Sequence, residues 1–366
     1  MNDVEGALEP RLTIGSEQLA LLEQLSNTIG VSGHEDAVRS LVIEKIRSRV
    51  DDLQVDTMGN VLAACRGTTA ERVKVMLAAH MDEVGFIITA DEGGGLYRIE
   101  RVGGLVTNWL AGKVVSVGRE TLPGFIGTVP IHLLDESDRG RAVSMKQLRV
   151  NLGAQGAGRV SLGEVGTYAT RFKVSSNTIF GKALDDRLGV ATLIELINHA
   201  PANIDLLAAF TVQEELGLRG AGIAAYKMTP DLAIAVDSTP AYDLPVWDGS
   251  ENTRWNSRLD DGPAIYVADR GTISDPRLVR HLVQAAEATG LPYQLRQPGG
   301  GGTDAGAIHR QRDGIPSVSV SVPGRYAHTP VMVARISDWQ ATVNLLYLAL
   351  QRMDRTILDR SDDDYR

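Results

Sequence analysis

Apolar runs alternate with helical segments over most of this chain, and this alternation limits the folds open to it. Residues 73–80 and 205–213 are nearly continuous apolar runs, typical of strands buried on both faces. From about residue 177 onward, strand-like and helix-like segments follow one another in turn. Such alternation predicts an α/β fold, with a mixed, mostly parallel sheet flanked by helices on both faces.

A stretch with a different residue pattern interrupts this alternation in the first half of the chain. Between residues 83 and 176 the sequence shows short β-like runs separated by glycine pairs and triplets, with almost no helical periodicity. A segment of this length suffices for a small β-barrel or sandwich. We therefore predict a catalytic domain made of residues 1–82 and 177–366, and an inserted β-barrel domain of residues 83–176.

The individual elements can be predicted from periodicity and capping residues. Ser32, followed three residues later by Glu35, forms a capping-box pattern, which predicts a helix from there to about residue 50. Other helices are predicted over residues 17–29, 186–199, 218–227, 276–289 and 337–353. Further strands are predicted over residues 60–65, 231–237, 264–268 and 317–322.

Charge and cysteine usage exclude several classes of partner and location. The chain of 366 residues has 46 acidic and 37 basic side chains, for a net charge of −9, so as a whole it repels phosphate backbones and anionic lipids. No apolar run approaches the ~20 residues of a membrane helix, and residues 1–11 lack the basic start and apolar core of a signal peptide. We expect a cytoplasmic protein with no nucleic-acid or membrane partner. The single cysteine, Cys65, is expected to be unreactive core.

Side chains that commonly bind metals cluster where the predicted strands end. In open α/β sheets, ligands gather beyond the carboxyl ends of the strands, so separate segments would deliver these groups to one crevice. Taken alone, an acid pair or a histidine is more often an ordinary polar group, and an aspartate at a helix start is more often a cap. The joint placement favours a metal site. The residues concerned are His80, Asp82, Asp185, Asp186, Glu214, Glu215, Asp237 and His328.

The donor types in this set indicate the chemistry. Two imidazoles and several carboxylates without a thiolate suit zinc, cobalt or manganese. A carboxylate that bridges two such ions would permit hydrolysis through a metal pair. Glu214 and Glu215 are adjacent, so one can bind metal while the other accepts a proton from water.

Five sequence motifs resemble those of the tetrahedral (TET-type) aminopeptidases and occur in the same order along the chain as in that family. The resemblance extends from about residue 18 to residue 353. One departure is Gly324, which stands where many relatives carry a side chain. The motifs are AHMDEVGF at 79–86, KALDDR at 182–187, VQEELG at 212–217, GGTDAGAIH at 301–309 and PGRYAHTP at 323–330.

The resemblance implies a function for each candidate residue. Asp185 would bridge two divalent ions, with His80 and Asp237 completing one site and Glu215 and His328 the other. Glu214 would be the general base. Asp82 would orient the His80 ring without itself binding a metal ion. The resemblance also implies a cis peptide between Asp185 and Asp186.

The same resemblance implies an activity and an assembly. We expect an aminopeptidase that acts on short peptides, whose barrel drives dimerisation and whose dimers assemble into a hollow dodecamer. The alternatives are another metal-dependent amide hydrolase or deacylase, and a non-catalytic assembly protein that kept the fold. A glucanase is disfavoured, because glycoside hydrolysis needs two free carboxyls and metal ligands are not free.

Overall fold

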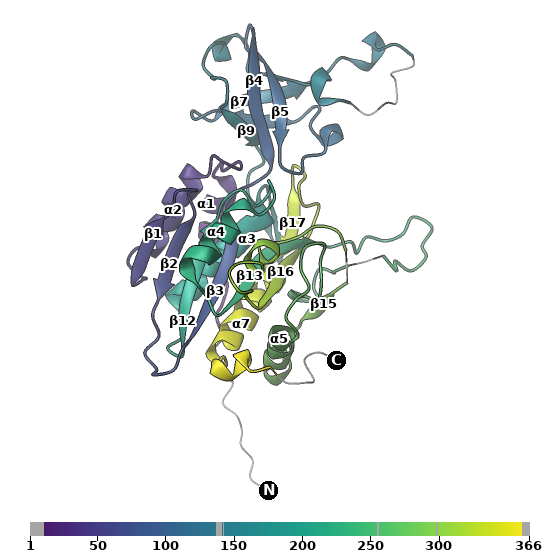
Figure 1. Cartoon of the computed structure of the whole chain (residues 1–366). Coiled ribbons are helices and arrows are strands. Elements are labelled where there is room, and N and C mark those ends of the chain that lie inside the picture. The colour runs from purple at the N-terminus through teal and green to yellow at the C-terminus, as the bar shows by residue number, and fades with distance from the viewer. Residues whose placement is uncertain (1–10, 137–140, 142, 255, 298, 361–366) are drawn as a thin grey trace.

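The computed structural model describes residues 11–136, 141, 143–254, 256–297 and 299–360, and has two parts. The larger is a mixed sheet with helices on both faces, and the smaller is a closed β-barrel that stands apart from it, at the top of Figure 1. The predicted α/β class with an inserted barrel is confirmed. Among the described residues, no helix is long and apolar enough to cross a membrane. Residues 1–10, on which the expectation about a signal peptide depends, lie outside the described part.

The large sheet is parallel at its centre and antiparallel towards its edges. Its strand order is β1-β2-β12-β3-β13-β16-β17-β11-β10, and β14 pairs with both β16 and β15. The pairs β12·β3, β3·β13 and β13·β16 are parallel, so the carboxyl ends of four central strands meet at one edge. The strands are β1 (Asp52–Val55), β2 (Val61–Cys65), β3 (Val73–His80), β10 (Lys173–Ser175), β11 (Thr178–Gly181), β12 (Ile204–Thr211), β13 (Leu232–Pro240), β14 (Ala264–Tyr266), β15 (Gln294–Arg296), β16 (Ser317–Arg325) and β17 (Met332–Arg335).

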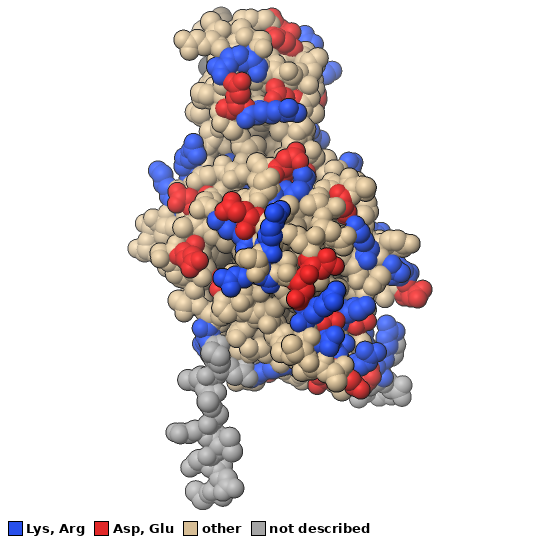
Figure 2. Space-filling model, turned by 90° about the vertical axis from the view of Figure 1, so that its left-hand side faces the viewer, with Lys and Arg blue, Asp and Glu red and all other residues tan. Residues whose placement is uncertain are grey.

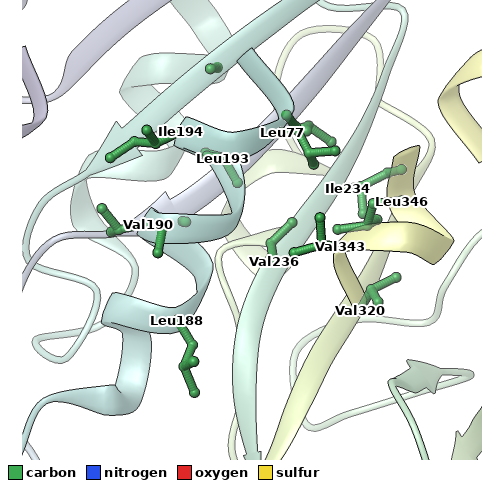
Figure 3. Packing of buried hydrophobic residues seen from close by; sticks show 14 of the residues in the cluster. Leu77, Leu188, Val190, Leu193, Ile194, Ile234, Val236, Val320, Val343 and Leu346 are labelled. Atoms are coloured by element: carbon green, nitrogen blue, oxygen red, sulfur yellow. The ribbon is translucent and has the colours of Figure 1, made fainter. Parts of the chain in front are cut away.

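Helices bury both faces of this sheet, which is why its central strands are apolar throughout. Leu77 of β3 belongs to the core that includes α3 and α7 on one face (Figure 3), whereas its neighbour Met76 belongs to the core that includes α4 and α6 on the other. Helices α1, α2 and α5 join the first of these cores. The helices are α1 (Ser16–Asn27), α2 (Asp36–Ile46), α3 (Leu184–Asn198), α4 (Arg219–Met228), α5 (Pro276–Thr289), α6 (Ala305–Ile308) and α7 (Ile336–Gln351).

The barrel has its own core and closes in the order β4-β5-β8-β7-β6-β9. Phe86, Tyr97 and Val115 are among the residues buried inside it. Because β10 pairs with β11 in the large sheet, the barrel strands end at Tyr168, before the predicted end of the insertion. We keep the three-part division of the chain as a proposal. The strands are β4 (Gly85–Gly93), β5 (Leu96–Val102), β6 (Val114–Val117), β7 (Leu122–Gly127), β8 (Arg149–Asn151) and β9 (Val165–Tyr168).

The predicted capping box at α2 is wrong. Glu35 is the N-cap residue, without a side-chain cap, and the helix begins at Asp36. The Ser32 hydroxyl instead donates to Asp82 Oδ2 at 2.6 Å, and the Glu35 carboxylate accepts the backbone N–H groups of Gly33 and Gln213. The Ser32 hydroxyl therefore has a tertiary partner in place of a local one, and Glu35 has one local and one tertiary partner.

Charges of both signs are interspersed over the face shown in Figure 2. On this face acidic and basic side chains lie next to one another, both over the barrel and over the layered body. The ion pair between Arg159 and Glu120 on the barrel is exposed. Exposed pairs such as this one contribute little to stability.

We expect Cys65 to report on unfolding. Its thiol is buried at the end of β2, and burial raises its pKa to about 11. The thiolate is the reactive species, so at pH 8 the native protein should react very slowly with a chromogenic disulfide reagent, whereas the denatured chain should release one equivalent rapidly. The reaction rate of the native protein should rise with pH towards 11. Rapid labelling of the folded protein at pH 8 would show that β2 opens readily.

Candidate metal centre

Six of the predicted residues meet at the carboxyl edge of the parallel strands. His80 is the last residue of β3, and Asp237 lies in β13. Glu214 and Glu215 follow β12, and His328 follows β16. The sixth residue, Asp185, lies at the start of α3, where the peptide to Asp186 is cis, as the resemblance implied.

Asp185 lies between two imidazoles. Its Oδ1 is 3.3 Å from His80 Nε2, and its Oδ2 is 3.4 Å from His328 Nε2. His328 Nε2 is also 3.0 Å from Glu215 Oε1. The two oxygens of the Asp185 carboxylate therefore face two different imidazole rings. A carboxylate that bridges two metal ions requires such an arrangement.

The His80 ring is surrounded by acids on both of its nitrogens. Its Nε2 is 3.8 Å from Asp237 Oδ1 and 3.9 Å from Glu214 Oε2. Its Nδ1 lies 3.4 Å from Asp82 Oδ1 and 3.1 Å from the Asp82 carbonyl oxygen. A carboxylate behind a ligating imidazole fixes the ring's orientation and raises its basicity.

Asp82 also organises the segment that carries the two glutamates. Its Oδ1 accepts the backbone N–H of Glu214 at 3.0 Å, and its Oδ2 accepts that of Glu215 at 3.2 Å. The side chain is fully buried and also accepts the Ser32 hydroxyl. One carboxylate thus holds both His80 and the backbone of the glutamate pair.

Asp186 lies within ligand distance as well, in a group with His80 and Asp237. However, both of its oxygens already accept backbone N–H groups, Oδ1 from Gly189 at 2.9 Å and Oδ2 from His80 at 3.2 Å. Asp185 has no such backbone partners among the described residues, and it belongs to a second group with His80 and Glu215. Asp185 is therefore the better candidate for a metal ligand. Asp186 is the better candidate for a residue that stabilises the end of β3 through its hydrogen bonds.

The electrostatics of the cluster favour a bound cation. Burial raises the pKa values of Glu214 and Asp237 well above their usual range, because a buried carboxylate without a counter-ion is costly. Burial alone would lower the pKa of His80, but the carboxylates of Glu214, Asp185 and Asp82 outweigh it and raise that pKa. Carboxylates outnumber imidazoles here, and divalent cations would neutralise the excess. The donor set therefore fits one or more divalent ions of the zinc, cobalt or manganese type.

The cluster opens into a cavity of about 920 Å³ to which both parts of the molecule contribute. Trp109 and Val106 of the inserted segment lie on its wall, as do the glycines at 300–302. Gly104 approaches His328 so closely that a Cβ there would lie 2.6 Å from Nδ1. The barrel segment therefore bounds the site, and a glycine at 104 leaves room for the His328 ring.

Two buried polar residues of this region were not named as site residues from the sequence. Asp304 is buried, accepts the Thr211 hydroxyl through Oδ2, and has no partner for Oδ1 among the described residues. Arg296, at the end of β15, lines the cavity. Asp304 falls within one of the motifs quoted above, whereas an arginine in a three-residue strand carries no sequence signal.

Comparison with known proteins agrees with these features. Residues 59–345 match the M42 glutamyl aminopeptidase family. A putative aminopeptidase of Acetivibrio thermocellus is 35% identical over 335 residues, which is 90% of this chain and 97% of that protein.

Solved structures agree as well. An aminopeptidase from Desulfurococcus kamchatkensis superimposes with a TM-score of 0.87 at 32% identity, covering 93% of this chain and 96% of that one. The TET1 peptidase of Pyrococcus horikoshii, which can assemble into a tetrahedron or a large octahedral shell, gives a TM-score of 0.79 at 30% identity, covering 92% of this chain and 100% of that one. With its fold, its strand-end cluster and this match over most of its length, the chain belongs to the M42 aminopeptidase family, whose members hydrolyse peptide bonds.

Proposed function

We propose that this chain is a two-metal aminopeptidase that removes N-terminal residues from short peptides. The observation that carries the proposal is the position of Asp185, whose two oxygens face His80 and His328 at 3.3 and 3.4 Å. Asp185 would be shared by two divalent ions, with His80 and Asp237 completing one site and Glu215 and His328 completing the other.

The bound ions would polarise the scissile carbonyl and increase the acidity of a water molecule. The chain's own residues do the rest. Glu214, whose side chain reaches the same cluster without facing His328, accepts the proton from the attacking water and passes it to the leaving amine. Asp82 holds the His80 ring in place through Nδ1. The excess of carboxylates around the cluster also suits the positive α-amine of a peptide's N-terminus.

We also propose a homo-oligomer in which the barrel mediates dimerisation and the dimers build a dodecamer. Two solved relatives support this idea, since one is described as a dodecamer and the other as able to assemble into a tetrahedron or a large octahedral shell. The large net negative charge and the short apolar runs support a cytoplasmic location without nucleic-acid or membrane partners. Mass photometry of the purified chain would test the assembly.

The activity can be tested with reconstituted protein. Chelator-treated protein should be inactive towards a panel of aminoacyl p-nitroanilides. Zinc, cobalt and manganese are then added one at a time. At least one of them should restore hydrolysis, and metal binding should saturate at two ions per chain by elemental analysis. The panel would also identify the preferred metal and the preferred N-terminal residue.

N-acetylated versions of the same anilides provide the control. An aminopeptidase needs the free α-amine, so these compounds should not be cleaved. Hydrolysis of N-acyl amino acids in place of the free-amine substrates would favour the deacylase alternative. Inactivity towards every substrate with every metal would favour the non-catalytic assembly protein.

A further inference from the structure

Two exposed apolar side chains, Val106 and Trp109, lie on the wall of the candidate catalytic cavity. The backbone N–H of Trp109 donates to the Val106 carbonyl oxygen at 3.0 Å, which closes a single 3-10 turn at Thr107–Trp109. Side chains three residues apart in such a turn lie above one another, so Val106 and Trp109 form one continuous apolar surface. We call these two residues the apolar platform.

The platform is held in place on both sides. Leu105 and Leu110 flank it in the sequence, and both are buried in the core of the barrel. Gly104, two residues before Val106, passes directly against the metal centre, since a Cβ there would lie 2.6 Å from His328 Nδ1. A peptide bound at the metal cluster therefore passes close to the platform.

The wall of the cavity is closed at the metal cluster and open at the platform. Asp237 and Tyr266 are 6% and 4% exposed, whereas Val106 and Trp109 are 42% and 43% exposed. In the proposed reaction the N-terminal residue and its scissile carbonyl bind at the metals, so the rest of the peptide leaves through the open part of the cavity. The residue that reaches the platform is therefore the second residue of the substrate, directly after the scissile bond.

The chemistry of the platform selects its ligand. Val106 and Trp109 offer apolar area, which is stabilised when another apolar side chain covers it and excludes water. The glycines at 300–302 lie on the same cavity wall and carry no side chains, which leaves room for a large group. An aliphatic or aromatic side chain fits this surface, and a small polar one gains little from it.

We propose that the apolar platform binds an aliphatic or aromatic side chain of the substrate's second residue and favours peptides that carry one. This inference rests on the aminopeptidase function proposed above. It gives the inserted segment a role in substrate selection in addition to the proposed role of the barrel in dimerisation.

The test uses tripeptides that differ only in their second residue. The first residue is the one hydrolysed fastest in the p-nitroanilide panel, the second is phenylalanine or serine, and the third is glycine. For the wild type we expect kcat/KM for the phenylalanine peptide to exceed that for the serine peptide by about 10- to 100-fold. Trp109→Ala should lower this ratio by about 10-fold and Val106→Ser by less, whereas Trp109→Phe should retain most of it.

Trp247→Ala is the matched control, because Trp247 is fully exposed and lies outside this cavity. It removes the same side chain and should leave the ratio unchanged. A second control compares two tripeptides that share their second residue and differ in the first. Their ratio should be the same in Trp109→Ala as in the wild type, and a change there instead would place the platform at the first residue and overturn the assignment.

The remaining outcomes separate this inference from the proposed function. No preference in the wild type, or an unchanged preference in folded Trp109→Ala protein, would overturn the inference while leaving the aminopeptidase intact. An unchanged preference together with dissociation of the oligomer in mass photometry would place Trp109 in a subunit contact instead. Melting temperatures identify folding defects, and Val106→Ser serves if Trp109→Ala does not fold. An inactive wild type would overturn the proposed function.

Discussion

Replacing Glu214 by glutamine is expected to lower kcat by about 10²–10⁴, the usual contribution of a positioned general base, while both metal ions stay bound. The amide keeps the shape of the side chain but cannot accept the proton from water. The two glutamates face different imidazoles, since Glu214 Oε2 is 3.9 Å from His80 Nε2 while Glu215 Oε1 is 3.0 Å from His328 Nε2. Steady-state rates and elemental analysis of the same sample would measure both effects.

Glu215→Gln is the matched variant, because it makes the same chemical change one residue away. A neutral amide oxygen is a poorer ligand for a divalent ion than a carboxylate, so this protein should lose most of one metal equivalent. Excess metal in the assay should then restore part of its activity, but should not rescue Glu214→Gln. If Glu214→Gln lost an ion and Glu215→Gln kept two, the proposed roles would have to be exchanged.

Replacing Glu83 by alanine is expected to lower the free energy of unfolding by about 3–5 kcal/mol, because it leaves buried cations without a counter-ion. Glu83 is 3% exposed, and its oxygens lie 2.8 and 3.0 Å from Lys182 Nζ. Arg187 Nη2 lies 3.6 Å from Glu83 Oε1, and the Thr167 hydroxyl of β9 donates to Oε2. The residue therefore connects the barrel to the segment that leads into Asp185. Chemical denaturation would measure the loss.

Glu92→Ala provides the comparison, because Glu92 also pairs with two cations, Arg98 and Arg149, but at the barrel surface. Water replaces the lost partner there, so the unfolding midpoint should hardly change. Equal losses for both variants would mean that Glu83 acts through side-chain packing and not through its charge. A small loss for Glu83→Ala would mean that water enters the junction.

The central strands could be predicted from the sequence, but the edge strands could not. Strand β3, as observed, coincides with the apolar run at residues 73–80, because a strand covered on both faces must be apolar on both. The short strands β10 and β15 have no such pattern, since they lie at the margin of the sheet and bury little. Their positions depend on pairing partners far away in the chain, which local periodicity does not record.

The clustering of the candidate metal ligands was predictable because they lie at strand ends, whereas the residues that support them were not. His80 and Asp237 follow or end apolar runs, so the topology of a parallel sheet brings them together. The Ser32 hydroxyl matched a local capping pattern but serves Asp82 instead. Arg296 and Glu83 act through contacts with residues distant in sequence, and such contacts exist only once the chain has folded.

The position of the barrel in the chain has a consequence for the order of folding. Strands β3 and β12 pair although they are roughly 130 residues apart, and most of the chain between them belongs to the barrel. The first and last barrel strands, β4 and β9, pair with each other, so a folded barrel brings its two ends side by side. This shortens the loop that β3 and β12 must close about threefold, which lowers the entropic cost by about 1 kcal/mol. We therefore expect the barrel to fold first from its local contacts and the residues of the candidate metal centre to meet last.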